Sequence, residues 1–189
     1  MRYQNEPTCM DALSFLQSLP DGCCHCCVTS PPYWGLRDYG ISGQYGLEDS
    51  PEAYIEHMVQ VFRGVWRVLR DDGTLWLNLG VSYAGSGKGE GGTYELSTKQ
   101  NSNRGSHYGK DNGEKNKFNH GLKPKDLCGI PWRVALALQA DGWYLRSDII
   151  WHKPNPMPES VTDRPTKSHE YIFLLTKNQR YYFDQEAVK

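Results

Sequence analysis

Residues 23–34 read Cys-Cys-His-Cys-Cys-Val-Thr-Ser-Pro-Pro-Tyr-Trp, and this stretch decides which fold we expect. Its first half consists of small, readily buried residues that lead directly into Val28 and Thr29, a pattern typical of a β-strand. The two prolines that follow lack a backbone N–H and hold φ nearly fixed. We therefore expect a core strand that delivers residues 30–34 into a loop at its carboxyl end, where α/β proteins commonly bind ligands.

The cysteines and histidine of residues 23–27 also suggest a zinc site. Zinc sites, however, usually present C-x-x-C pairs on turns, with a second pair some distance away. The run in this chain is contiguous and continues as a strand, so we favour a core strand over a metal site and expect no metal. Disulfides are not expected either, because no secretory signal precedes the run.

Helix and strand patterns alternate along the chain. Apolar residues at three-and-four spacing predict helices over residues 11–19, 51–69 and 132–140. Short apolar runs predict strands over residues 74–79, 143–151, 169–176 and 180–183, the last two paired as a hairpin. We expect the second helix to stop at Asp71-Asp72-Gly73, with Gly73 as a C-cap. The class is α/β, with the strands after Gly22, Gly73 and Gly142 parallel and the hairpin strand antiparallel.

The bulk properties fit one domain, residues 1–189, without a membrane partner. The chain has 189 residues and a formal net charge of −1, which gives no overall sign of a nucleic-acid or membrane partner. No signal segment and no apolar run long enough to cross a bilayer are present, so we expect a soluble, cytoplasmic protein.

Residues 85–125 form an insert rich in Gly, Ser, Asn and Lys that has almost no apolar periodicity. It carries eight basic and four acidic residues, so it is locally basic. We interpret it as a flexible arm that reaches for phosphates; a solvated loop with no partner is the alternative.

The Ser-Pro-Pro-Tyr segment can perform a particular chemistry. The exocyclic amine of cytosine or adenine is a poor nucleophile, because its lone pair is delocalised into the ring. Acceptors around its two hydrogens would localise that lone pair for direct attack on a methyl donor. We assign the Ser30 hydroxyl and the Pro31 carbonyl as these acceptors, Pro32 as a rigid spacer, and Tyr33 as an aromatic platform for an unstacked base.

Residues 29–40 resemble the catalytic motif and following loop of the DNA amino-methyltransferases, particularly phage and bacterial cytosine-N4 enzymes. The resemblance implies S-adenosylmethionine as cofactor and a three-layer, Rossmann-like methyltransferase fold. The segment that begins Met10-Asp11-Ala12-Leu13 is similar to the family's segment that contacts the adenosine part of the cofactor. Asp11 is therefore a cofactor candidate together with Thr29, although Asp11 is equally suited to be a helix N-cap.

Four residues near the motif or in the later loop are candidates for contact with DNA: Trp34, Arg37, Lys153 and Arg164. Residues 151–154 and 169–171 resemble the family's late strand and hairpin, which places the last two basic residues in the intervening loop. Lone basic residues are more often surface charges, and this alternative stays open.

The sequence departs from the family in one respect. The family's F-x-G-x-G cofactor turn lies near the C-terminus in enzymes with this motif order, and this chain stops before it. The glycine cluster at residues 85–89 is not expected to replace it, because no helical pattern follows. We therefore expect a partial catalytic domain with an incomplete sheet, completed by self-association or a second polypeptide.

We expect site-specific methyl transfer to the N4 amine of cytosine in DNA, in a bacterial cell or a phage-infected host. Ser30 favours this interpretation, because related adenine-N6 enzymes more often carry Asp or Asn at that position. The alternatives are an adenine-N6 enzyme, an RNA or small-molecule methyltransferase, and a non-catalytic DNA-binding remnant or fragment.

Overall fold

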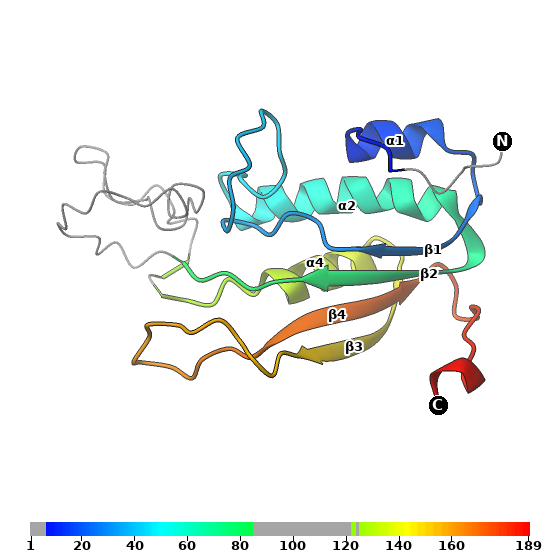
Figure 1. Ribbon diagram of the computed structural model, residues 1–189. Coiled ribbons are helices and arrows are strands. Elements are labelled where there is room, and N and C mark those ends of the chain that lie inside the picture. The colour runs from blue at the N-terminus through cyan, green and yellow to red at the C-terminus, as the bar shows by residue number, and fades with distance from the viewer. Residues whose placement is uncertain (1–6, 85–121, 124) are drawn as a thin grey trace.

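The computed structural model describes residues 7–84, 122–123 and 125–189 (Figure 1). Its helical elements are α1 (Ala12–Ser18), α2 (Pro51–Val68), α4 (Ile130–Ala140) and a short 3₁₀ turn, η2 (Glu186–Val188). Its strands are β1 (Cys24–Thr29), β2 (Leu69–Leu79), β3 (Tyr144–His152) and β4 (His169–Thr176). Almost all of the predicted insert, residues 85–125, lies outside this described part.

The strands form one mixed sheet in the order β1-β2-β4-β3. Strand β1 is parallel to β2, whereas β4 is antiparallel to both β2 and β3. The expected arrangement of three parallel strands and one antiparallel strand is confirmed. We call the edge at which β1, β2 and β3 end and β4 begins the carboxyl edge, and the opposite one the amino edge; Figure 1 shows the carboxyl edge on the left.

Helices α2 and α4 pack against each other over one face of the sheet. Each begins with proline in its first turn, and Ser50 caps α2 by accepting a hydrogen bond from Ala53 N. The core between helices and sheet is mostly apolar; its largest fully buried side chains include Tyr54, Met58, Phe62, Leu75, Leu77, Leu79, Leu138, Phe173 and Leu175. The α/β class and mixed sheet are thus as expected.

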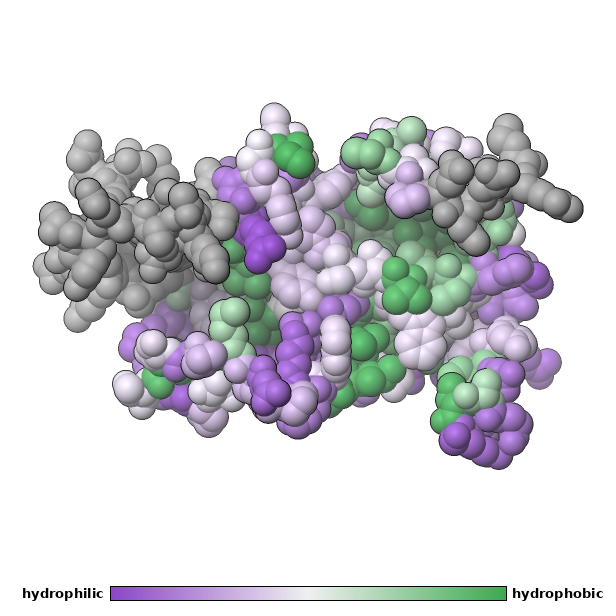
Figure 2. Space-filling model, in the orientation of Figure 1, coloured by the Kyte–Doolittle hydropathy of each residue, from purple (hydrophilic) through white to green (hydrophobic). Residues whose placement is uncertain are grey.

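The other face of the sheet carries no helix in the described residues, so two of the three expected layers are present there. Val28 of β1 points to this face and is 79% exposed. Figure 2 shows hydrophobic residues among polar ones over the strands. Among the described helices, none is both long and apolar enough to span a membrane.

The expectation that residues 23–27 form a core strand is only partly right. The strand exists, but Cys23 and Cys26 are exposed, and Cys24 and Cys27 are half-buried against the core. The reason is the position of β1 at the end of the described sheet, with one face uncovered. Burial raises the pKa of the Cys27 thiol to about 11, so it is protonated at neutral pH. In the part of the chain that is described, no cluster of His, Cys, Asp or Glu could hold a metal ion.

Two other expectations are wrong. Residues 180–183 are not a strand, because β4 already pairs with β2 on one side and β3 on the other and has no free edge. Gly73 is not a helix cap: α2 ends at Val68, and Leu69 is its C-cap. Gly73 instead lies inside β2 where backbones approach closely, and a Cβ there would be 3.0 Å from the carbonyl oxygens of Arg70 and His25.

Candidate active site at the carboxyl edge

The Ser-Pro-Pro-Tyr segment leaves the sheet at the carboxyl edge, directly after Thr29, the last residue of β1. Three polar residues of other strands reach the same edge. Asn78 is the penultimate residue of β2, Lys153 follows the last residue of β3, and Glu170 is the second residue of β4. The topology therefore brings together residues far apart in the sequence.

The Tyr33 hydroxyl is the meeting point of these side chains. It accepts a hydrogen bond from Ser30 Oγ (3.1 Å) and lies 2.7 Å from Asn78 Oδ1 and 3.2 Å from Glu170 Oε2. Its single hydrogen is thus shared between two acceptors on β2 and β4. Burial raises the pKa of Tyr33, and the negative charge of Glu170 acts in the same direction. Tyr33 is therefore a neutral phenol that is anchored at its hydroxyl.

Glu170 is itself fixed on its other side. Its Oε1 accepts a hydrogen bond from Lys153 Nζ, and the two side chains form an ion pair. Burial raises the pKa of Glu170, but hydrogen bonds from Lys153 and Asn78 outweigh this effect and hold the pKa below its ordinary value. The Lys153 ammonium also lies 5.0 Å from the centre of the Trp151 ring. Glu170 is therefore a carboxylate at neutral pH.

Gly80, just beyond β2, makes room for the Tyr33 ring. A Cβ at this position would be 2.4 Å from both Cδ2 and Cε2 of Tyr33, a distance that atoms do not adopt. The ring thus packs directly on the Gly80 backbone, and only glycine permits this contact.

The prolines of the segment are held by the helix beneath them. The hydroxyl of the fully buried Tyr54 of α2 donates to the Pro32 carbonyl at 2.9 Å. Within the described residues, the Pro31 carbonyl has no hydrogen-bond partner, and Ser30 is exposed. The two predicted acceptors, Ser30 and Pro31, therefore stand side by side on a rigid segment.

Hydrogen bonds hold the loop that follows the segment. Gly35 N donates to Gly46 O at 2.8 Å, and Gly46 N donates to Glu48 Oε2 at 2.9 Å. Gly46 has a φ of +93°, and a Cβ there would be 2.9 Å from the Tyr33 carbonyl oxygen. Glu48 in turn contacts His57 of α2 at 3.0 Å.

The two cofactor candidates lie at different places. Asp11 is the N-cap of α1, where its Oδ1 accepts hydrogen bonds from Ser14 N and Oγ at 2.9 and 3.0 Å. Those bonds lower the pKa of Asp11, whose side chain is exposed. Burial raises the pKa of Tyr45, and the negative charge of Asp11 acts in the same direction. Thr29 is partly exposed and is paired in register with Leu77.

The four residues predicted to contact DNA differ in their burial and in their partners. Trp34 is only 5% exposed and its Nε1 donates to Glu48 O, so it belongs to the core and not to a surface that DNA could touch. Lys153 is paired with Glu170, and Arg164 with Glu159 at 2.6 Å. Arg37 is exposed over the Tyr39 ring and has no acidic partner among the described residues.

Sequence reasoning missed Asn78, Gly80, Glu170 and Tyr54. A usable signal existed for Asn78, because a polar residue interrupts the apolar run of β2 near its carboxyl end. Glu170 stood within a stretch that looked like packing alone.

The chain is similar to known DNA methyltransferases. Residues 24–189 match the model of the DNA methylase family, which groups N6 and N4 methyltransferases. The chain is 56% identical to the type II methyltransferase M.Cfr9I of Citrobacter freundii, over 95% of this chain and 56% of that protein. It is 55% identical to M.SmaI of Serratia marcescens, over 95% of this chain and 58% of that protein. The chain thus spans little more than half the length of these relatives.

Solved structures share the fold. The PvuII DNA methyltransferase (cytosine-N4-specific) is 16% identical with a TM-score of 0.62, and the match covers 95% of this chain and 51% of that one. A putative DNA modification methylase of Thermus thermophilus, solved in complex with S-adenosyl-L-methionine, is 23% identical with a TM-score of 0.57. That match covers 93% of this chain and 57% of the other.

Proposed function

The chain belongs to the DNA methylase family of N6 and N4 methyltransferases, and on that premise we propose that it transfers a methyl group from S-adenosylmethionine to the N4 amine of cytosine in DNA. The observation that carries the proposal is the carboxyl edge. Ser30 and the Pro31 carbonyl stand there as acceptors beside a tyrosine whose ring and hydroxyl are both fixed.

These residues support a direct transfer. The Tyr33 ring offers a stacking surface to a base that has left the duplex, and such stacking stabilises it by about 1–3 kcal/mol. The Ser30 hydroxyl and the Pro31 carbonyl accept the two hydrogens of the amine and localise its lone pair on nitrogen. The amine nitrogen would attack the methyl group that the cofactor supplies, and the proton that the methylated amine gives up would pass to solvent. Preorganised acceptors of this kind need no rearrangement during the reaction.

S-adenosylmethionine would supply an electrophilic methyl group on a positively charged sulfur. Asp11 fits a role in holding it: the residue is exposed, and only its Oδ1 has hydrogen-bond partners in the described residues. Thr29 lies directly before the acceptors and is the second candidate.

The choice of cytosine over adenine rests on Ser30. The serine side chain is short and places its accepting oxygen close to the backbone. The adenine-N6 relatives implied by the resemblance more often carry the longer side chains of Asp or Asn. Adenine-N6 transfer is the second candidate.

The test is expression of the chain in a host strain that lacks DNA methyltransferases of its own, followed by mass spectrometry of the nucleosides from its genomic DNA. A whole genome offers every short target sequence, so the target need not be known. We expect N4-methyldeoxycytidine, and none with Ser30→Ala. N6-methyldeoxyadenosine alone would establish the second candidate and refute the first. Unmodified DNA would refute the proposal that this chain is active by itself.

Binding of the cofactor is measured separately by isothermal titration of the purified chain with S-adenosylmethionine. We expect saturable binding that Asp11→Ala weakens. An Asp11→Asn variant is the matched control, because asparagine caps a helix equally well. If both variants bind as the wild type does, Asp11 is only the cap of α1.

We also propose that the sheet is completed by a second copy or a further polypeptide. Support comes from β1, which pairs with β2 alone within the described residues and exposes Val28 beside it. Sedimentation of the purified chain is the test: a monomer at all concentrations would exclude the second copy.

A further inference from the structure

We propose that Glu170, held in place by Lys153, is a positioning residue that fixes the Tyr33 ring in the orientation in which an unstacked base meets it. This inference rests on the proposed function, because it concerns the same site. It also gives Lys153 a role inside the protein, in place of the contact with DNA phosphate that the sequence suggested.

The first step is the anchoring of the ring at its two ends. The backbone of Tyr33 is held in the loop, where Pro32 is bonded by Tyr54 at 2.9 Å. The far end, the hydroxyl, lies within hydrogen-bond distance of Asn78 at 2.7 Å and Glu170 at 3.2 Å. With Gly80 against one part of the ring, sideways movement is blocked. The stacking surface is therefore ordered before any base arrives, which removes an ordering cost from binding.

The side chains of Asn78 and Glu170 are held in different ways. Asn78 is oriented by its own strand neighbour, since its Nδ2 donates to the Tyr171 carbonyl at 3.1 Å. The Glu170 carboxylate has no such backbone contact in the described residues; hydrogen bonds from Lys153 and Asn78 hold it, and of these two only Lys153 adds an ion pair. Without the ammonium, a carboxylate whose side chain is only 22% exposed would turn to solvent or take up a proton. Lys153 thus acts on Tyr33 through Glu170.

The residues of this network come from all four described strands or from the segments that follow them. Lys153 follows β3 and Glu170 is the second residue of β4. Asn78 is the penultimate residue of β2, and Tyr33 lies in the segment after β1. The network thus crosses the whole described sheet at the carboxyl edge. A shift of any strand would move the ring, so the network couples the integrity of the sheet to the geometry of the site.

The experiment is a double-mutant cycle with Tyr33→Phe and Glu170→Ala, measured as the kcat and KM of methyl transfer. If Glu170 acts only through the Tyr33 hydroxyl, each single variant lowers kcat about tenfold and the double variant is no worse than the single ones. KM for S-adenosylmethionine stays unchanged. Multiplying effects would overturn the proposal. Glu170→Gln, which keeps an acceptor, should recover part of the loss.

A second readout does not need activity. The chain with 3-fluorotyrosine at position 33 gives one ¹⁹F resonance; we expect Glu170→Ala and Lys153→Met to shift or broaden it. The matched control is Glu52→Gln, which breaks the 2.9 Å ion pair to Arg133 between α2 and α4 and should leave it unchanged. An unchanged resonance in folded Glu170→Ala would overturn the positioning role even if methyl transfer is observed. A shifted resonance without any methyl transfer would support positioning while refuting the proposal that this chain is active by itself.

Discussion

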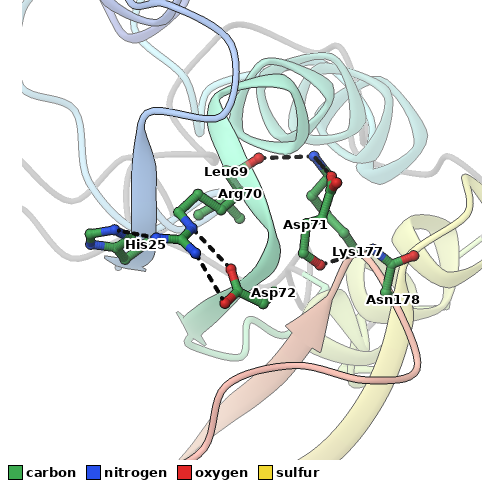
Figure 3. Close-up of polar contacts among 7 residues, drawn as sticks. All are labelled: His25, Leu69, Arg70, Asp71, Asp72, Lys177 and Asn178. Atoms are coloured by element: carbon green, nitrogen blue, oxygen red, sulfur yellow. Dashed lines mark hydrogen bonds and ion pairs between the residues drawn. The ribbon is translucent and has the colours of Figure 1, made fainter.

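Both edges of the sheet carry an ammonium, carboxylates and an amide, but these groups have different partners at each edge. At the amino edge, charged and polar side chains tie β1, β2 and the end of β4 together (Figure 3): His25, Arg70, Asp71, Asp72, Lys177 and Asn178, with the Leu69 carbonyl. At the carboxyl edge, the Lys153–Glu170 pair and Asn78 converge on one neutral hydroxyl.

The two networks differ in the partners that their charged groups bind. At the amino edge, Arg70 is bonded to Asp72 at 3.1 Å and to His25 at 3.0 Å, and Lys177 donates to the Leu69 carbonyl at 2.8 Å. These groups partner one another or the backbone, so the network holds strands together. An open hollow of about 370 Å³ lies here, lined by Gly22, Arg70, Asp71 and Asp72. This hollow therefore lies at the edge of the sheet opposite to the side chains that converge on Tyr33.

At the carboxyl edge, we expect the largest effect on activity from Gly80→Ala. The new Cβ would overlap the Tyr33 ring, so the ring or the backbone must move. A shift of the ring by about 1 Å should lower the rate of methyl transfer on the order of 100-fold. Overpacking should lower the free energy of unfolding by about 1–3 kcal/mol. Methylation rates and urea unfolding measure both.

Gly64→Ala in α2 is the control for that change. The Cβ there would be 3.0 Å from the flexible end of the Leu16 side chain, which can move away. We expect an unchanged methylation rate. An equal loss of rate in both variants would show that any added methyl group is damaging, and would remove the special role of Gly80.

The amino edge is tested by Lys177→Met. The Lys177 side chain is only 12% exposed, and its removal leaves the Leu69 carbonyl without this donor. We expect a loss of about 1–3 kcal/mol in urea unfolding. The methylation rate should not change under conditions where the variant is folded. A lowered rate in the folded variant would erase the distinction between the edges.

The pH dependence of stability tests the Glu170 carboxylate at the carboxyl edge. Hydrogen bonds from Lys153 and Asn78 outweigh burial and hold the pKa of Glu170 below its ordinary 4.5 in the folded chain. The unfolded chain thus binds this proton at higher pH, so ionised Glu170 stabilises the fold above about pH 4.5 and loses this effect as the pH falls through the folded pKa. Urea unfolding should show the advantage of wild type over Glu170→Gln at neutral pH and its decline in acid; an advantage independent of pH would contradict the assignment.

The smallest effect is expected from Asp72→Asn. Its partner Arg70 and Asp72 itself each have side chains that are 49% exposed. Ion pairs of this kind contribute about 0–1 kcal/mol and are weakened by salt. Urea unfolding at low and high salt should show a small difference that salt removes. A loss comparable to that of Lys177→Met would mean that the amino edge acts as one cooperative unit.

Local pattern was sufficient for most of the fold. The helix predicted over residues 51–69 and the strand predicted over residues 74–79 follow from the spacing of apolar residues, and the structure confirms both. Residues 180–183 are equally β-rich, but a strand also needs a free edge. Which edge is free depends on pairing between distant segments, and no local pattern contains it.

The same limit applies to the site. The Ser-Pro-Pro-Tyr segment is contiguous, so a role for it could be proposed from residue chemistry. Its partners Asn78 and Glu170 are far from Tyr33 in sequence and reach it only through the strand order. Trp34 was misjudged because aromatic character alone does not distinguish a base-stacking surface from a core residue, and its burial shows that it is the latter.

The place of β4 bears on how the protein is made. Thr74 and Thr176 are neighbours in the sheet although about a hundred residues separate them, and such distant pairing slows folding. During translation β1 and β2 leave the ribosome long before β4, which must insert between β2 and β3. Until then the strand edges of a nascent chain are unpaired and open to association with other chains. Chaperone binding to ribosome-bound chains should therefore persist until residue 176 has emerged.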